Sequence, residues 1–177
     1  MFKKLLLASA VLALGSQVAL AGAPYVGVGV GMRVNTNNVS SFRGMPGSLF
    51  AGYGANVGQG IYLAGEINGT LATANITDNG LRSTYDYGLS LIPGIMISDH
   101  TLGYLRVGYI RTNFSPAGAK SETVNGGQLG LGLQTSLMQD WDLRGEYTFG
   151  AYSSLHHGAG TNPRSDEFTL ALIYKFD

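Results

Sequence analysis

The sequence has 177 residues and contains no cysteine, few charged residues and no excess of either charge. A chain without cysteine has no disulfide bonds, so its stability must come from another source. The 11 basic and 11 acidic residues balance, which argues against a nucleic-acid binder. With charged residues at 12% and 27 glycines, the composition fits neither a disordered chain nor a helical bundle.

Long apolar runs are also missing. The apolar run from Leu5 to Leu14 has only about half the length that a membrane helix needs. It follows Lys3 and Lys4 and precedes Ala19-Leu20-Ala21, the small-x-small pattern of a signal-peptidase site. We therefore expect residues 1–21 to be a cleaved signal peptide and residues 22–177 to form one domain that is exported through the periplasm.

The rest of the sequence repeats one pattern, a segment of about ten residues in which apolar residues alternate with small or polar ones. Alternation with a period of two is typical of β-strands, and a tilted strand of about 9–11 residues spans a bilayer. Eight such segments can be recognised, at Tyr25–Val34, Ser48–Asn56, Ile61–Leu71, Tyr85–Ile97, Leu102–Asn113, Gly126–Leu137, Trp141–Tyr152 and Glu167–Phe176.

The connections between these segments alternate in length. Short connections at 57–60, 98–101 and 138–140 alternate with longer polar ones at 35–47, 72–84, 114–125 and 153–166. Outer-membrane barrels show this rhythm, because their periplasmic turns are short and their outer loops are long. The pattern predicts an even number of strands with both termini on the periplasmic side.

The two faces of the expected strands differ in chemistry. One face is apolar and uncharged: Val26, Val28, Val30, Met32, Leu49, Ala51, Tyr53, Ile61, Leu63, Ile67, Leu89, Leu91, Leu105, Val107, Tyr109, Leu129, Leu131, Leu133, Leu143, Tyr147, Phe149, Phe168, Leu170, Leu172, Tyr174 and Phe176. The other is small, polar or charged: Gly27, Gly29, Gly31, Gly52, Gly54, Tyr62, Glu66, Asn68, Ser90, Tyr104, Arg106, Gly108, Gln128, Gly130, Gly132, Gln134, Arg144, Glu146 and Thr148.

The glycines decide which face is inside. On a solvent-exposed face they would weaken the strands without benefit, whereas in the lumen of a narrow barrel they leave room for large neighbours such as Tyr104 and Arg144. The sequence therefore predicts an all-β fold, an eight-stranded antiparallel up-and-down transmembrane β-barrel, with the polar face inside. Aromatic residues near the strand ends suit interfacial girdles: Tyr25, Tyr53, Tyr85, Tyr87, Tyr109, Trp141, Tyr174 and Phe176.

Several stretches resemble a known family. They are GLSLIPGIMIS (Gly88–Ser98), LGYLRVGYIRTNF (Leu102–Phe114), NGGQLGLGLQ (Asn125–Gln134), WDLRGEYTF (Trp141–Phe149) and LALIYKF (Leu170–Phe176). They are similar to the small outer-membrane β-barrels of Gram-negative bacteria, the opacity-porin and OmpA/OmpX-like group. The resemblance implies location in the outer membrane, contact with its lipid and lipopolysaccharide, and insertion by the barrel assembly machinery. It also implies that Tyr174 and Phe176 form the terminal assembly signal, although Asp177 follows the aromatic residue on which the family usually ends.

Four charged residues share the lumen register: Glu66, Arg106, Arg144 and Glu146. Two acids and two bases cancel, as a packed lumen of low dielectric constant requires. Relatives hold a similar internal salt-bridge network, which in some has been discussed as a gate. We expect these four residues to form a lumen charge network that acts mainly as a static plug.

No catalytic, cofactor or metal site is expected. His156 and His157 stand in the last outer connection, but a metal site needs more ligands of fixed geometry. A lipid-modifying barrel enzyme would use a histidine followed by a serine, whereas Ser153 and Ser154 precede His156.

The leading functional interpretation is a non-enzymatic barrel anchor that presents four surface loops, in envelope integrity or in contact with a host or another extracellular ligand. The alternatives are a narrow low-conductance channel, a lipid-modifying barrel enzyme, and a soluble lipocalin-like binder, whose apolar pocket the lumen charges would spoil.

Overall fold

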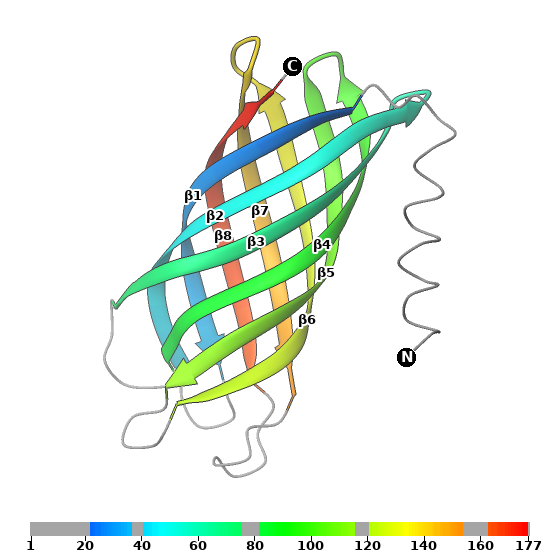
Figure 1. The fold of residues 1–177 in the computed structure, drawn as a ribbon. Coiled ribbons are helices and arrows are strands. Elements are labelled where there is room, and N and C mark those ends of the chain that lie inside the picture. The colour runs from blue at the N-terminus through cyan, green and yellow to red at the C-terminus, as the bar shows by residue number, and fades with distance from the viewer. Residues whose placement is uncertain (1–21, 37–40, 76–81, 116–120, 154–162, 177) are drawn as a thin grey trace, which may run out of the picture.

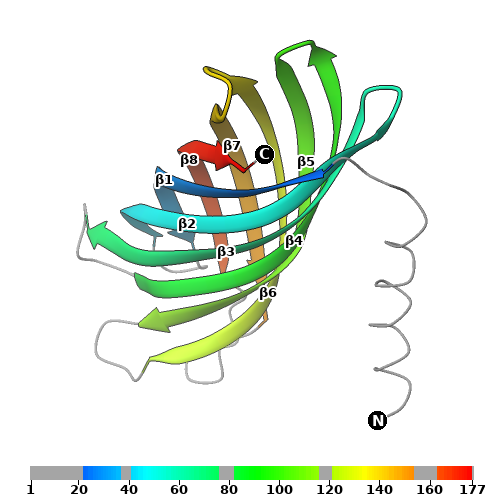
Figure 2. The same ribbon diagram turned by 45° about the horizontal axis from the view of Figure 1, so that its top comes forward.

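The protein folds as a single closed sheet, seen in a computed structural model that describes residues 22–36, 41–75, 82–115, 121–153 and 163–176. The strands are β1 (Gly22–Thr36), β2 (Ser41–Gly58), β3 (Ile61–Asn75), β4 (Arg82–Ser98), β5 (Thr101–Ser115), β6 (Glu122–Ser136), β7 (Trp141–Tyr152) and β8 (Arg164–Lys175). Each strand pairs antiparallel with the next, and β1 pairs with β8 to close the barrel (Figure 1). Figure 2 shows the tilted strands from nearer the barrel end. The predicted fold class is confirmed.

Short turns and longer connections lie at opposite ends of the barrel. The β2–β3, β4–β5 and β6–β7 turns gather at the top of Figure 1, together with the C-terminal end of β8. In the β2–β3 turn, Gly58, Gln59 and Gly60 all have positive φ, a conformation that glycine adopts without strain. Short turns of this kind face the periplasm in outer-membrane barrels, so we refer to this end as periplasmic and to the opposite end as outer.

Most strands are longer than predicted, whereas β7 has the predicted bounds, Trp141–Tyr152. β2 has 18 residues and β4 has 17, and β1 and β2 remain paired as far as Thr36 and Ser41. The predicted bounds of the long loops, such as 35–47, therefore include residues that belong to the strands. The prediction assumed that a strand ends where the membrane ends, but strand pairing continues into water wherever outward side chains become polar.

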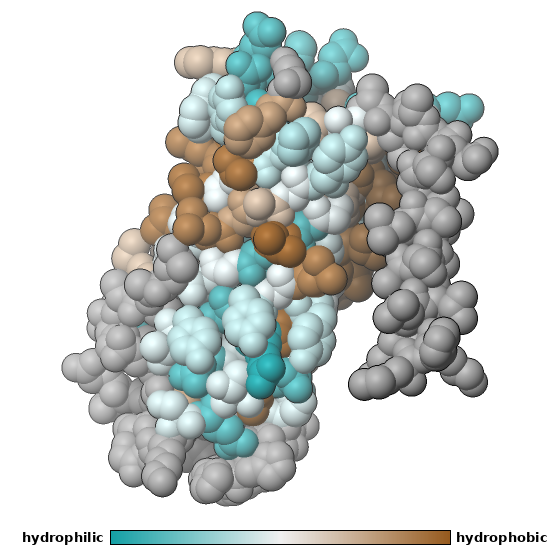
Figure 3. Space-filling model, viewed as in Figure 1, coloured by the Kyte–Doolittle hydropathy of each residue, from teal (hydrophilic) through white to brown (hydrophobic). Residues whose placement is uncertain are grey.

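The sidedness of the barrel agrees with the prediction. Leu131 is 60% exposed and Val107 is 52% exposed, whereas Arg106 is 4% and Glu146 is 9% exposed. In Figure 3 the apolar side chains form a band over the periplasmic half of the visible face, and the outer half is more hydrophilic. The strands therefore cross the hydrocarbon with their periplasmic halves and project beyond it with their outer halves. Among the described residues, no helix is long and apolar enough to cross a membrane.

The lumen also contains apolar packing that was not predicted. Near the periplasmic end a buried cluster includes Phe50, Ile92 and Ile173, and near the outer end Phe114 packs edge-on against Tyr152. Lumen glycines make room for rings, as two examples show. A Cβ at Gly132 would overlap the ring of Tyr104, and one at Gly52 would lie 2.5 Å from the Tyr25 hydroxyl. The large lumen side chains thus stack against glycine on neighbouring strands, as expected for a narrow barrel.

Candidate functional site

The four predicted lumen charges lie together in the barrel and form what we call the central cluster: Glu66 from β3, Arg106 from β5, and Arg144 and Glu146 from β7. Glu66 bridges the two arginines, with 2.6 Å from its Oε1 to Arg106 Nη2 and 2.6 Å from its Oε2 to Arg144 Nη1. Arg106 Nε also donates to Glu146 Oε1 at 2.8 Å. Every charge in this buried set has an opposite charge beside it.

Neutral groups complete the central cluster. Tyr25 donates its hydroxyl to Glu66 at 2.9 Å, and Tyr104 donates to Glu146 at 2.5 Å. Arg144 donates to Gln134 Oε1 through Nε and Nη2, and its guanidinium lies 4.8–5.5 Å from the ring centroids of Tyr25, Phe50 and Tyr104. Such contacts stabilise a buried cation.

Tyr25 corrects one prediction. It was assigned to an interfacial girdle, but it is only 4% exposed and lies in the lumen. The alternation along β1 carries the necessary signal, because Tyr25 shares its face with the inward-facing Gly27. Tyr25 was assigned to the girdle because it lies near the strand end, but this position does not tell which face of the strand the side chain occupies.

A second set of charges, the outer cluster, was not predicted. Arg33 from β1 forms ion pairs with Asp86 from β4 and Glu167 from β8. Its guanidinium also donates to Thr70 at 3.2 Å and to Ser83 at 3.4 Å. This cluster has one cation for two anions, and no described residue donates a hydrogen bond to Asp86 Oδ1.

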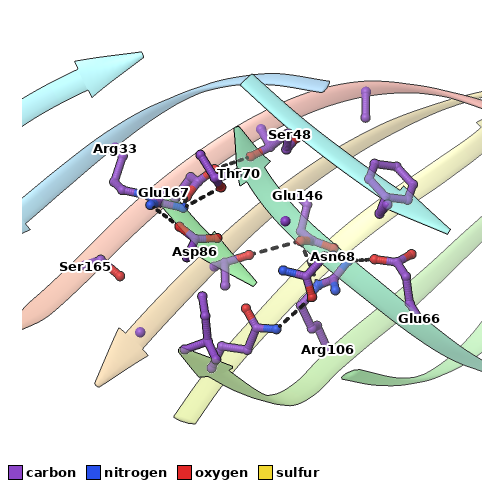
Figure 4. Close-up of a pocket in the computed structure, with 18 of the residues that line it drawn as sticks. Arg33, Ser48, Glu66, Asn68, Thr70, Asp86, Arg106, Glu146, Ser165 and Glu167 are labelled. Atoms are coloured by element: carbon purple, nitrogen blue, oxygen red, sulfur yellow. Dashed lines mark hydrogen bonds and ion pairs between the residues drawn. The ribbon is translucent and has the colours of Figure 1, made fainter. Parts of the chain in front are cut away.

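A small cavity of about 60 Å³ is lined by residues of both clusters, including Arg33, Asp86, Glu66 and Arg106 (Figure 4). Polar contacts also extend from the central cluster toward the periplasmic mouth. Gln134 Nε2 donates to Asp142 at 2.6 Å, and Asp142 pairs with the half-buried Lys175 at 2.9 Å. The lumen is therefore crossed by paired charges at more than one level, and what remains open between the clusters is large enough for only a few waters.

Within the described ranges, no group of three histidine, cysteine, aspartate or glutamate side chains could hold a metal ion. His156, His157 and Ser154 lie outside the described residues, as do the expected signal peptide and Asp177.

Comparison with known proteins agrees with this picture. A family described as "Outer membrane protein beta-barrel domain" matches residues 5–176. The chain belongs to this family of outer-membrane β-barrels. Its location is accordingly the bacterial outer membrane, where its apolar band contacts lipid, and the predicted family resemblance and localisation are confirmed.

Solved structures with the same fold include Neisserial surface protein A, at 18% identity and a TM-score of 0.68, covering 86% of this chain and 97% of that one. Ail, the attachment invasion locus protein of Yersinia pestis, has 15% identity and a TM-score of 0.58, with coverages of 88% and 99%. A second Ail structure contains the heparin analogue sucrose octasulfate, and it has 16% identity, a TM-score of 0.56 and the same coverages. No curated protein sequence matches the chain significantly.

Proposed function

We propose that the protein is a non-enzymatic surface anchor, in which a rigid barrel holds four outer connections toward the surroundings of the cell. The observation that carries this proposal is the filled lumen. Glu66, Arg106 and Arg144 are at most 4% exposed, and their ion pairs span from β3 to β5 and β7. A lumen used in this way for internal bracing leaves the outer connections as the natural place for function.

The fold relatives support a surface role. By their names, one is a neisserial surface protein and the other is an attachment and invasion protein, and the latter has been crystallised with a heparin analogue. At this level of identity the likeness establishes the fold, so contact with a host or another extracellular ligand is proposed for this chain on its own geometry.

Adhesion measurements test the proposal. Bacteria that display the chain are expected to bind cultured epithelial cells or heparin beads better than bacteria with an empty vector. Replacing residues 154–162 by a glycine-serine segment of equal length should reduce the binding. The same kind of replacement in the periplasmic turn 137–140 is the matched control and should leave it unchanged. Adhesion no better than that of the empty vector would reject the surface-contact role.

The alternatives predict different results. A channel would give conductance steps in a planar bilayer, and we expect none, because the central cluster closes the lumen. A lipid-modifying enzyme would release fatty acid from lipopolysaccharide, and we expect no release. Conductance that is lost on mutation of a lumen residue would favour a channel over the anchor. Fatty-acid release that is lost on mutation of His156 would favour an enzyme.

The C-terminal strand is proposed to carry the assembly signal for the barrel assembly machinery. The Tyr174 ring packs edge-on against Trp141 and Phe176, with centroids 5.2 Å and 5.0 Å apart, and Phe176 is 43% exposed. Phe176→Ala should slow appearance of the heat-modifiable folded form in membranes. Removal of Asp177 should speed it, if a terminal aromatic is what the machinery reads. Unchanged assembly of Phe176→Ala would contradict this role.

A further inference from the structure

Three arginines stand on the outside of the barrel with no partner among the residues that the structure describes. Arg43 on β2, Arg111 on β5 and Arg164 on β8 are exposed and face away from the lumen. No residue in the described part of the chain forms an ion pair or hydrogen bond with them. Since the lumen arginines are all paired, these three cations serve no internal purpose that the structure reveals.

Each of these arginines lies just beyond the outer limit of the apolar band. On β5 the outward side chains run Leu105, Val107, Tyr109 and then Arg111. On β8 they run Leu172, Leu170, Phe168, Asp166 and then Arg164. The same order appears on β2, where Arg43 follows the exposed Leu49 and Met45. The guanidinium groups are therefore placed at the level of the outer headgroups.

Two of the arginines lie close to each other. Arg43 pairs in register with Val34 on β1, and Val34 pairs with Asp166 on β8, so Arg43 and Asp166 share one row across three strands. Arg164 lies two residues further out on β8. With strands about 4.8 Å apart and about 3.4 Å per residue, the Cα atoms of Arg43 and Arg164 are roughly 12 Å apart. Two extended arginines at this spacing can reach one headgroup.

The patch also contains one acid, Asp166, whose Oδ1 accepts a hydrogen bond from the Tyr147 hydroxyl, so the two arginines still leave a net positive charge. The periplasmic end has the opposite character. Asp99 there is exposed, Asp140 is half-buried, and Lys175 is paired with Asp142. Among the described side chains, the unpaired positive charge is thus confined to the outer boundary of the barrel.

We infer that Arg43 and Arg164 bind phosphate groups of the outer-leaflet glycolipid, with Arg111 as a separate contact across the barrel. Guanidinium groups hold phosphate through paired, charge-assisted hydrogen bonds, and basic residues at a membrane surface attract anionic headgroups. The exposed apolar side chains directly below, such as Phe168 and Leu170, offer a surface to the acyl chains of the same molecule. A free phosphate ion would gain nothing from that surface, so the structure favours the lipid. This inference depends on the outer-membrane location and is independent of the proposed adhesive role.

Purified barrel in a neutral detergent provides the test. The probe is lipid A with two phosphates, and the lipid retained per barrel is counted by native mass spectrometry. The wild-type barrel should retain lipid A, with lower occupancy at high salt. The double variant Arg43→Gln/Arg164→Gln should bind about 30-fold more weakly, and Arg164→Gln alone about fivefold more weakly. Arg43→Lys/Arg164→Lys should retain most of the binding, and Asp166→Asn should strengthen it. A normal shift in gel mobility on heating verifies that each variant is folded.

Two further probes separate lipid from phosphate. Dephosphorylated lipid A should bind no better to the wild-type barrel than to the double variant, and inorganic phosphate at millimolar concentration should fail to displace lipid A. The inference is overturned if the double variant retains lipid A like the wild type, if dephosphorylated lipid A binds equally well, or if inorganic phosphate alone displaces the lipid.

Discussion

The central and outer clusters solve the same problem differently. Both keep charges inside a barrel, but the central cluster matches two arginines with two glutamates, and the outer cluster matches one arginine with two acids. The central cluster lies at the level of the apolar band, where an unpaired charge is most costly. The outer cluster lies nearer the outer end of the barrel and lines the small cavity, which has room for a few waters. Buried charges are therefore balanced one for one in the middle of the apolar band, whereas an excess acid is tolerated where a few waters can lie beside the cluster.

Glu66→Ala should have the largest effect. Loss of this side chain leaves Arg106 with one acid and Arg144 with none, so the free energy of unfolding should fall by about 3–5 kcal/mol. Urea unfolding in lipid vesicles, followed by the fluorescence of Trp141, measures it. A loss below about 1 kcal/mol would mean that the central cluster does not hold the barrel together.

Asp86→Ala in the outer cluster should cost less, about 1–3 kcal/mol. Arg33 keeps Glu167 and Thr70 as partners, and water can replace the missing carboxylate at this level. The same unfolding measurement applies. If Asp86→Ala and Glu66→Ala destabilise the barrel equally, the depth of a cluster does not set its energetic importance.

The sequence predicted the central cluster but not the outer one, and the reason is physical. Alternation is unambiguous where every outward neighbour is apolar, as around Arg106 and Arg144. The outer-cluster residues Arg33, Asp86 and Glu167 stand at the ends of the predicted segments Tyr25–Val34, Tyr85–Ile97 and Glu167–Phe176, where few further residues remain to support the alternation. Continuing the period by one step from Gly31 and from Thr169, and by two steps from Ser90, would still have placed all three in the lumen.

Other features lay beyond the reach of a periodic pattern. The pattern identified the eight strands and their faces, but strand ends depend on pairing between strands, which one sequence does not display. The hydroxyl contacts of Tyr25 and Tyr104 depend likewise on how β1 and β5 are staggered against β3 and β7. Stagger is a property of the closed barrel rather than of any single segment.

Glycine substitutions compare the packing of the central cluster with that of the lipid face. Gly132→Ala places a methyl group against the Tyr104 ring, which holds Glu146, so we expect a loss of about 1–3 kcal/mol. Gly65→Ala is the matched control, because a Cβ there meets nothing within 4 Å. It should change the free energy of unfolding by less than about 0.5 kcal/mol. Equal effects in vesicle unfolding would show that Tyr104 moves aside freely.

Asp86→Asn should have the smallest effect of all, a change within about 0.5 kcal/mol in either direction. Asparagine retains an oxygen for Arg33 and removes the one negative charge that the outer cluster does not balance, so a weaker hydrogen bond is offset by a smaller desolvation cost.

Glu146→Gln makes the same chemical change in the central cluster, but there it creates a net positive charge beside Arg106 and weakens the acceptor for Tyr104. It should therefore cost about 1–3 kcal/mol. Parallel unfolding of the two variants isolates the charge balance from the shape of the side chain. If both variants lose a similar free energy of unfolding, the excess acid of the outer cluster stabilises the fold as much as a balanced acid of the central cluster does.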